Sequence, residues 1–228
     1  MVDRRTENSK LGEISRLIPE SLHQKSGAVF YSGRAAYSGQ SPLYMIGVNP
    51  GGDPGARPNE TVSWHTGRVL QEMPDNWSAY RDESWRNARP GTSGMQPRVL
   101  HMLERLGLDP GTVPASNVVF SRSKRESTFS GDFQKEARLC WPLHLAVIKM
   151  LRVRVIVCFG RTAGKWVCAE AGASRQIGEF VEANRRRWSS GAYEAASGLR
   201  VVVVPHPSIA DWSSPFSDPS DLVKDTLG

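Results

Sequence analysis

The sequence has few cysteines and no hydrophobic run long enough to cross a membrane. Its 228 residues include only Cys140, Cys158 and Cys168, which form no Cys-x-x-Cys pair and are too few for a four-cysteine zinc or iron–sulfur site. The longest apolar runs include Val155–Phe159 and Val201–Val204, far short of the roughly 20 residues that a transmembrane helix needs. These shortages argue against a cysteine-held metal centre and a membrane-spanning protein.

Other common signals are missing as well. The five histidines are scattered without metal-ligand spacing, and we expect neither a metal nor a cofactor. The start of the chain, Met1–Lys10, is polar and has no apolar signal core. Gly160–Trp166 is not a phosphate-binding loop, because its glycine spacing is one residue short and Trp166 replaces the required Ser or Thr. We therefore expect a cytoplasmic monomer with no membrane partner.

Positive charge is in excess. The 29 Lys and Arg residues outnumber the 23 Asp and Glu residues, for a formal net charge of +6. Lys and Arg bind nucleic acids by releasing the counterions condensed on the phosphates, so this balance favours a nucleic-acid partner. Many basic proteins bind none, so charge alone decides little. A hydrophobic content of 39% suits one folded α/β domain of this length.

Strands and helices alternate along the chain. Apolar runs predict buried strands, and apolar residues at helical spacing predict the helices between them. The predicted strands are Leu43–Val48, Asn117–Ser121, Arg154–Phe159 and Leu199–Val204. The predicted helices are Pro97–Leu106, Phe133–Met150, Thr162–Ala171 and Pro219–Leu227, with Pro142 expected to kink or end the second. This alternation predicts a three-layer α/β/α fold around a central, mainly parallel four-stranded sheet.

No linker or internal repeat divides the chain. Residues 1–27 form a polar lead-in with a short amphipathic helix around Leu11–Leu22, and residues 28–228 form a single domain. Residues 52–96 are rich in Gly, Pro, Asn and Trp, which predicts a long functional loop with at most short helices. Residues 173–199 are polar, so we expect a surface excursion of helix plus turn, whose three consecutive arginines are more typical of a solvated face.

Two of the predicted strands end in polar residues held among prolines and glycines. The first strand ends in Gly47-Val48-Asn49-Pro50-Gly51, and the fourth ends in Pro205-His206-Pro207-Ser208. Ligands of open α/β sheets bind beyond the carboxyl ends of the strands. We therefore expect these two strand ends to embrace one ligand.

These segments resemble the catalytic motifs of the uracil-DNA glycosylase superfamily. Tyr44–Gly51 is similar to the first motif, in the Asn-Pro-Gly form of the mismatch-specific and single-strand-selective branches. Val202–Ser208 is similar to the second motif, with its His-Pro-Ser core, and Val155–Ala163 looks like the strand and turn between them. The resemblance covers roughly Leu43 to Ser208. It implies that residues 28–228 are a catalytic domain of that family, acting on single- or double-stranded DNA.

The resemblance also implies a reaction and a role for each motif residue. A monofunctional DNA glycosylase flips a base out of DNA and hydrolyses its bond to the sugar. Asn49 would orient the attacking water, and His206 would stabilise the negative charge of the departing base. The expected base-binding residues are Gly47, Val48, Pro50, Gly51, Trp64, Ser121 and Arg122. The expected DNA-binding residues are Gly52, Lys124, Arg125, Arg161, Lys165, Pro207, Ser208 and Ile209, of which Ile209 would fill the emptied stack. No lysine beside either motif must serve as a Schiff-base nucleophile, so we expect no strand cleavage.

The nature of the base depends on the position where the family commonly has an amide that reads the pyrimidine edge. Arg122, or alternatively Ser121, occupies that position here. Arg has only donors and cannot make the paired contacts of an amide. The sequence therefore favours a modified pyrimidine, such as a hypermodified phage cytosine removed in anti-phage defence, over plain uracil removed in base-excision repair. A non-catalytic DNA-binding module on the same fold is the third hypothesis. Purely structural roles for Asn49, Trp64 and His206 stay open.

Overall fold

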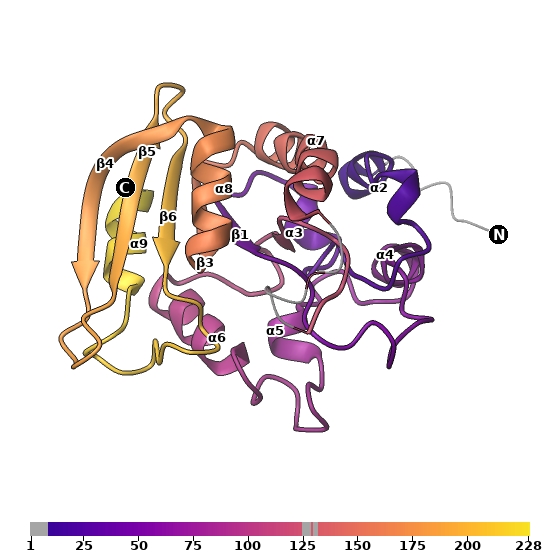
Figure 1. The fold of residues 1–228 in the computed structure, drawn as a ribbon, viewed down its shortest axis with the longest axis horizontal. Coiled ribbons are helices and arrows are strands. Elements are labelled where there is room, and N and C mark those ends of the chain that lie inside the picture. Colours follow the sequence, from indigo (N-terminus) through magenta and orange to yellow (C-terminus); the bar gives the residue numbers. More distant parts are fainter. Residues whose placement is uncertain (1–8, 125–128, 130–131) are drawn as a thin grey trace.

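The computed structural model describes residues 9–124, 129 and 132–228, so the expected DNA contact Arg125 lies outside the described residues. Within them, one mixed sheet has the strand order β2-β1-β3-β6-β5-β4 (Figure 1). Its parallel strands are β2 (Ala115–Asn117), β1 (Leu43–Gly47), β3 (Val155–Phe159) and β6 (Arg200–Val204). The antiparallel strands β5 (Ser189–Ala195) and β4 (Ala173–Val181) extend it on the β6 side. The predicted α/β fold with a mostly parallel sheet is confirmed.

The sheet is wider than predicted, and the prediction of helix plus turn for residues 173–199 was wrong. These residues supply the hairpin β4–β5, so the sheet has six strands where the sequence predicted four. β4 is an exposed edge strand along most of its length, so its polar residues lack the apolar alternation by which strands are recognised. The helix α9 (Ser220–Leu227) covers the hairpin, with Leu222 directly against Gly178 of β4.

Helices cover both faces of the sheet (Figure 1). Alternating strand residues point to opposite faces: Tyr44 and Ile46 enter one core, whereas Leu43 and Met45 enter the other. The first core is closed by α7 (Phe133–Leu151) and α8 (Arg161–Ala171), and the second by α6 (Gln96–Arg105) and α9. This layering leaves the carboxyl ends of the parallel strands uncovered by either helical layer.

α7 runs as a single helix through Pro142, so the helix does not end there. The Asp132 side chain caps its first turn by accepting a hydrogen bond from the Lys135 amide at 3.1 Å. Pro142 lies on the exposed side of the helix, and residues on the opposite side, such as Leu143 and Val147, are fully buried. Core packing on both sides of the proline therefore keeps the helix continuous despite the lost backbone hydrogen bond.

The remaining helices lie in the first half of the chain. They are α2 (Lys10–Ser15), a short 3-10 helix (Glu20–Leu22), α3 (Ala35–Ser38), α4 (Val62–Gln71) and α5 (Ala79–Asp82). α2 sends Leu11 and Ile14 into the first core. α4 has ten residues, so the long loop that the sequence predicted carries a larger helix than expected. No helix in the described part of the chain is long and apolar enough to span a membrane.

Candidate active site

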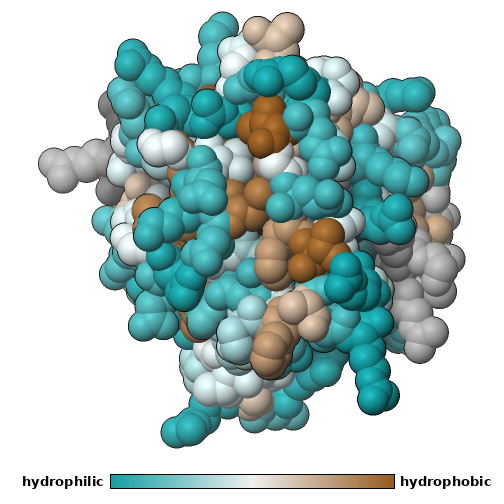
Figure 2. Space-filling view, turned by 90° about the vertical axis from the view of Figure 1, so that its left-hand side faces the viewer, coloured by the Kyte–Doolittle hydropathy of each residue, from teal (hydrophilic) through white to brown (hydrophobic). Residues whose placement is uncertain are grey.

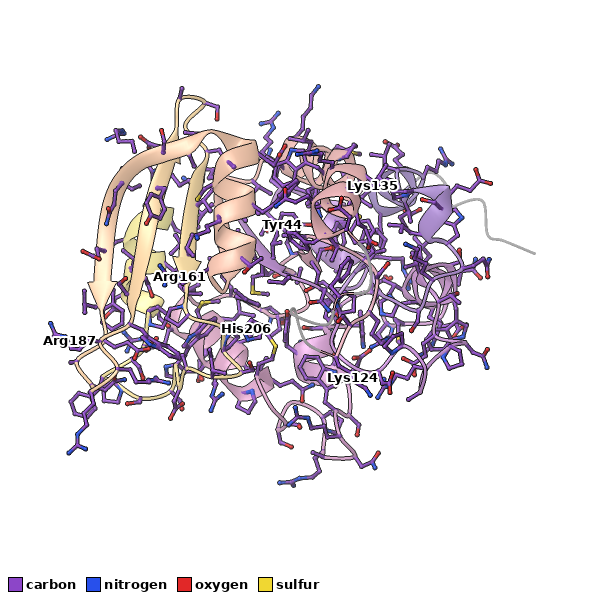
Figure 3. All side chains as sticks on the ribbon, in the orientation of Figure 1. Tyr44, Lys124, Lys135, Arg161, Arg187 and His206 are labelled. Carbon is purple, nitrogen blue, oxygen red and sulfur yellow. The ribbon has the colours of Figure 1, made fainter. Side chains whose placement is uncertain are left out.

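The two polar strand ends lie at one edge of the sheet. Ile46 pairs with Cys158, which in turn pairs with Val203. Asn49 follows Ile46 by three residues, and His206 follows Val203 by three residues. Both therefore lie just beyond the carboxyl ends of their strands, at the same edge of the sheet. Neighbouring strands are about 4.8 Å apart, which sets the two chain segments roughly 10 Å from each other across β3. Figure 3 shows His206 near the end of β6, at the carboxyl edge of the sheet, which is the lower edge in this view.

The turn after β3 lies between these two residues and contacts both regions. Gly160 has a φ of +91°, a conformation that L side chains rarely adopt. It faces the His206 side chain, since an ideal Cβ at Gly160 would lie 3.5 Å from His206 Cβ and 3.7 Å from Cδ2. Two residues later, Thr162 lines the same pocket as Asn49. The turn therefore joins the surroundings of Asn49 and His206 into one site.

The side chain of Asn49 is held in one orientation. Its Nδ2 donates to the Pro50 carbonyl at 2.8 Å and to the Ser123 carbonyl at 3.3 Å. Both neighbours are acceptors, so the atom that faces them must be the amide nitrogen. The carbonyl oxygen Oδ1 is consequently turned away from them, and Asn49 itself lines the pocket. An acceptor fixed in this way suits the binding of a water molecule.

The ring of His206 is also fixed, and its tautomer follows from its neighbour. The backbone N–H of Ser208 donates to His206 Nδ1 at 3.1 Å, and Ser208 Oγ lies 2.8 Å from the same atom. A backbone N–H can only donate, so Nδ1 is the acceptor and the proton of the neutral ring resides on Nε2. His206 therefore presents a neutral N–H donor on the side opposite Ser208.

Hydrogen bonds hold the loop that carries His206 in place on both sides. The Trp212 indole N–H donates to the Pro205 carbonyl at 3.2 Å, and Arg98 Nη1 donates to the Pro207 carbonyl at 2.5 Å. The Ala210 amide donates back to the His206 carbonyl at 3.0 Å. A donor on such a loop is preorganised, which is what electrostatic stabilisation of a developing charge requires.

A pocket opens beside Asn49. Its lining residues are Val48, Asn49, Phe129, Phe133 and Thr162, and its cavity volume is about 160 Å³. The Phe129 and Phe133 rings meet edge to face with centroids 6.2 Å apart. Sequence reasoning missed both phenylalanines and Thr162. The signal available was the pair of phenylalanines, one shortly before the long helix and one at its first residue, but nothing in the sequence shows that the two rings lie beside the first motif.

Gly47 lies at the base of the site, where an added Cβ would force the buried Asn117 side chain to shift. A Cβ at this position would approach Asn117 Oδ1 to 2.3 Å. Asn117 is buried and hydrogen-bonds the Tyr31 hydroxyl, while burial raises the pKa of Tyr31 to about 12. Tyr31 lies beside His65, whose pKa burial lowers to about 4. This neutral cluster under the first motif was not foreseen, because its members are far apart in sequence.

Two of the expected base-binding side chains, Trp64 and Ser121, have other contacts. Trp64 lies in the first turn of α4, is 43% exposed, and has the Arg68 guanidinium 4.9 Å over its ring. Ser121 binds the buried Glu136 carboxylate through both its amide and its hydroxyl, at 2.9 Å each. These contacts account for both side chains without a ligand, so base binding by Trp64 and Ser121 stays a prediction.

Arg122 braces the turn of the first motif. Its guanidinium donates to the Gly51 carbonyl at 2.7 Å, to Glu60 at 3.1 Å and to Ser26 Oγ at 3.2 Å. Its side chain is only 9% exposed, and its Cδ lies 3.5 Å from the ideal Cβ position of Gly52. For Arg122 to read a base, some of these bonds would have to open. In the unbound protein it positions the loop formed by Pro50 to Gly52.

The expected DNA-binding residues surround the site. Arg161 and Lys165 lie exposed in the first turns of α8, and Lys124 pairs with Asp53 at 2.7 Å and keeps 63% of its side chain exposed. The side chain of Pro207 is buried, whereas Ser208 and Ile209 are exposed, Ile209 by 59%. In Figure 3, Lys124 and His206 lie in the lower half of the molecule, Arg161 lies near mid-height, and Tyr44 and Lys135 lie above all three. The structure thus brings basic side chains to the edge that carries His206.

The three cysteines contribute no reactive thiolate. Burial raises the pKa of Cys140 and Cys158 well above the usual range and that of Cys168 to about 11. None of them is in a disulfide. Among the residues that the structure describes, no three His, Cys, Asp or Glu side chains gather as metal ligands.

Comparison with known proteins agrees with this geometry. Residues 34–219, more than four fifths of the chain, match the family described as the Uracil DNA glycosylase superfamily. The match includes the segments of both Asn49 and His206. No curated protein matches the chain.

Proposed function

This chain belongs to the uracil DNA glycosylase superfamily, and from that membership we propose that it removes a pyrimidine-type base from DNA by hydrolysing the N-glycosidic bond. The observation that carries the proposal is the pairing of a neutral N–H donor with an amide acceptor across one sheet edge. His206 presents Nε2–H, and Asn49 presents Oδ1. The base is out of reach inside a duplex, so it enters the site only after it has been flipped out.

Each group has a distinct task in the cleavage. When the bond between the anomeric carbon and the base nitrogen breaks, its electron pair leaves with the base, and positive charge develops on the sugar. His206 Nε2–H donates a hydrogen bond to a carbonyl oxygen of the base and stabilises the departing anion. Asn49 Oδ1 accepts a hydrogen bond from a water molecule, whose oxygen bonds to the anomeric carbon. The proton released from that water returns to the base nitrogen.

Asn49 is a weak proton acceptor, and this determines which group contributes most of the rate enhancement. An amide oxygen orients water but does not take its proton as a carboxylate would. The main contribution is therefore stabilisation of the leaving group by His206. The products are a free base and an abasic site, and the sugar–phosphate strand stays intact.

For the base itself we propose a modified pyrimidine. The pocket beside Asn49 leaves about 160 Å³ for a substituent, lined by Val48, Thr162 and two phenylalanines. The position where the family commonly has an amide reader holds Arg122, whose donors are used within the protein. Both features suit a base that is larger than uracil and is recognised by shape. Hypermodified cytosines of phage DNA fit this description, and their removal would act as anti-phage defence.

A panel of labelled oligonucleotides tests the reaction and the base together. The strands carry uracil, 5-hydroxymethylcytosine or glucosylated hydroxymethylcytosine, and hot alkali cleaves at any abasic site. Mass spectrometry identifies the free base. We expect release of a modified base and little release of uracil. Release of uracil alone would make the protein a base-excision repair enzyme, as the family match also allows, and would refute the modified-base proposal.

A non-catalytic DNA-binding module is the alternative of another class. It would shift the same oligonucleotides in a gel and release no base from any of them. Two fixed, complementary polar groups favour an enzyme, because binding alone requires neither. Challenge of cells that carry the gene with phages of modified and unmodified DNA tests the defence role, with protection against only the modified phages as the expected outcome.

A further inference from the structure

The hairpin β4–β5 ends beside the candidate active site. Its turn, residues 182–188, is called the hairpin tip below and lies at the same lower edge as the ends of β3 and β6 (Figure 1). The Ala183 amide donates to the Phe216 carbonyl at 2.8 Å, and Arg186 Nη1 donates to the Ile209 carbonyl at 2.6 Å. Ile209 follows His206 by three residues. The tip is therefore fastened to the loop that carries His206.

The hairpin tip is internally ordered. The Glu182 amide donates to the Trp188 carbonyl at 2.8 Å and closes the turn. The Glu182 carboxylate is buried and pairs with Arg186 at 3.2 Å, and it also accepts from Asn184 at 2.8 Å. The Arg186 guanidinium stacks over the Trp188 ring at 4.4 Å. These contacts hold the tip in one shape before any ligand arrives.

Two positive charges remain on the outside of the tip. Glu182 is neutralised by Arg186, whereas Arg185 and Arg187 are exposed and form no ion pair with any residue in the described ranges. Figure 3 places Arg187 at the outer end of the tip, at the edge where His206 lies. The face built by β4 is largely hydrophilic, with small separate hydrophobic areas, and long hydrophilic side chains project from its lower rim (Figure 2).

We propose that the hairpin tip is a second DNA contact, at which Arg185 and Arg187 bind backbone phosphates beside the flipped nucleotide. This inference rests on the proposed function. The tip connects the first and second strands beyond β6, so it lies roughly 10 Å from the strand that carries His206. At 3.4 Å per phosphate along one strand, this is about three nucleotides. The planar donor fork of arginine matches phosphate oxygens.

Exposed apolar side chains lie on the tip and on the two segments that it contacts. Ile209 is 59% exposed, Phe216 is 60% exposed and Trp188 is 37% exposed, and the tip contacts the backbone of the first two. A basic rim with aromatic and apolar groups beside it is how proteins bind unstacked nucleic-acid strands. A purely solvated arginine face, as the sequence suggested, would not require the tip to be fastened to the His206 loop.

The test compares two double variants with the same change in charge. Arg185→Ala/Arg187→Ala removes the outer charges of the tip. Lys149→Ala/Arg154→Ala removes two exposed charges near the amino ends of the strands, on the opposite edge. Anisotropy of a fluorescein-labelled duplex of ordinary bases gives Kd at several salt concentrations. Arg185→Lys/Arg187→Lys keeps the charge and controls for folding, and the oligonucleotide panel measures base release by each variant.

We expect the tip variant to bind roughly tenfold more weakly per lost contact at 0.1 M salt, and the slope of log K against log salt to fall by about 2. The opposite-edge variant should bind like the natural protein, and the lysine variant should recover most of the affinity. Equal losses in both alanine variants, or a loss in neither, would overturn the proposal. If the natural protein releases a base and the tip variant binds DNA with unchanged affinity, the second contact alone would be refuted. If the tip variant shows the lower salt slope but the natural protein releases no base, the proposed reaction would be refuted.

Discussion

Replacement of His206 by alanine removes the donor on which the proposed reaction depends. Its neutral Nε2–H is one preorganised hydrogen bond to the departing base, fixed by the Ser208 amide. Loss of one such donor costs about 10²–10³ in rate, or roughly 3–4 kcal/mol of transition-state stabilisation. The neutral ring carries no charge to a phosphate. We therefore expect the affinity for DNA to stay within about twofold of the natural protein.

Single-turnover base release with protein in excess measures the chemical step, and anisotropy measures DNA binding separately. His101→Ala is the matched control, because the His101 ring on α6 pairs with Asp218 at 2.9 Å and does not line the pocket beside Asn49. Its base-release rate should be unchanged. A drop of less than about tenfold for His206→Ala, or an equal loss of affinity and rate, would refute a role for His206 in stabilising the leaving group.

Three further perturbations test the surroundings of the site. Asn49→Asp places a carboxylate oxygen against the carbonyls of Pro50 and Ser123, so we expect a stability loss of about 1–3 kcal/mol by urea denaturation, and an unchanged midpoint would contradict the assigned amide orientation. Gly160→Ala forces a Cβ onto a residue with φ +91° and should cost about 1–3 kcal/mol, seen as a lower Tm. Burial lowers the pKa of His144 to about 4, below the unfolded value near 6.5, so its contribution to the free energy of unfolding is complete above pH 6.5 and is lost as the pH falls toward 4, by about 3 kcal/mol in all. His144→Gln should therefore flatten the dependence of that free energy on pH between 6.5 and 4. An unchanged slope would contradict the lowered pKa.

The sequence predicted the parallel centre of the sheet and its two polar ends because their signals are local. β3 and β6 are continuous apolar runs, and each motif stands directly after such a run. The observed strands Val155–Phe159 and Arg200–Val204 lie within one residue of the predicted bounds. Since parallel neighbours end at one edge, the expected meeting of Asn49 and His206 at one edge of the sheet follows from topology alone.

Long-range contacts were beyond such reasoning. The hairpin β4–β5 is stabilised by pairing and by α9, while its own residues are largely polar, so no apolar pattern marks it. β2 ends at Asn117 rather than at Ser121 as predicted, so Arg122 lies five residues beyond the strand, and Glu60 and the Gly51 carbonyl hold its guanidinium. Phe133 begins a correctly predicted helix, but its position in the pocket depends on how that helix packs against the first motif.

A crystal structure of Asn49→Ala bound to an oligonucleotide that carries the released base tests the central claim most directly. We expect the extruded base at the carboxyl edge of the sheet, with His206 Nε2 about 2.7–3.1 Å from a base carbonyl oxygen and the base substituent in the pocket of Val48 and Phe133. A base bound elsewhere, or a His206 ring turned away from it, would contradict the account.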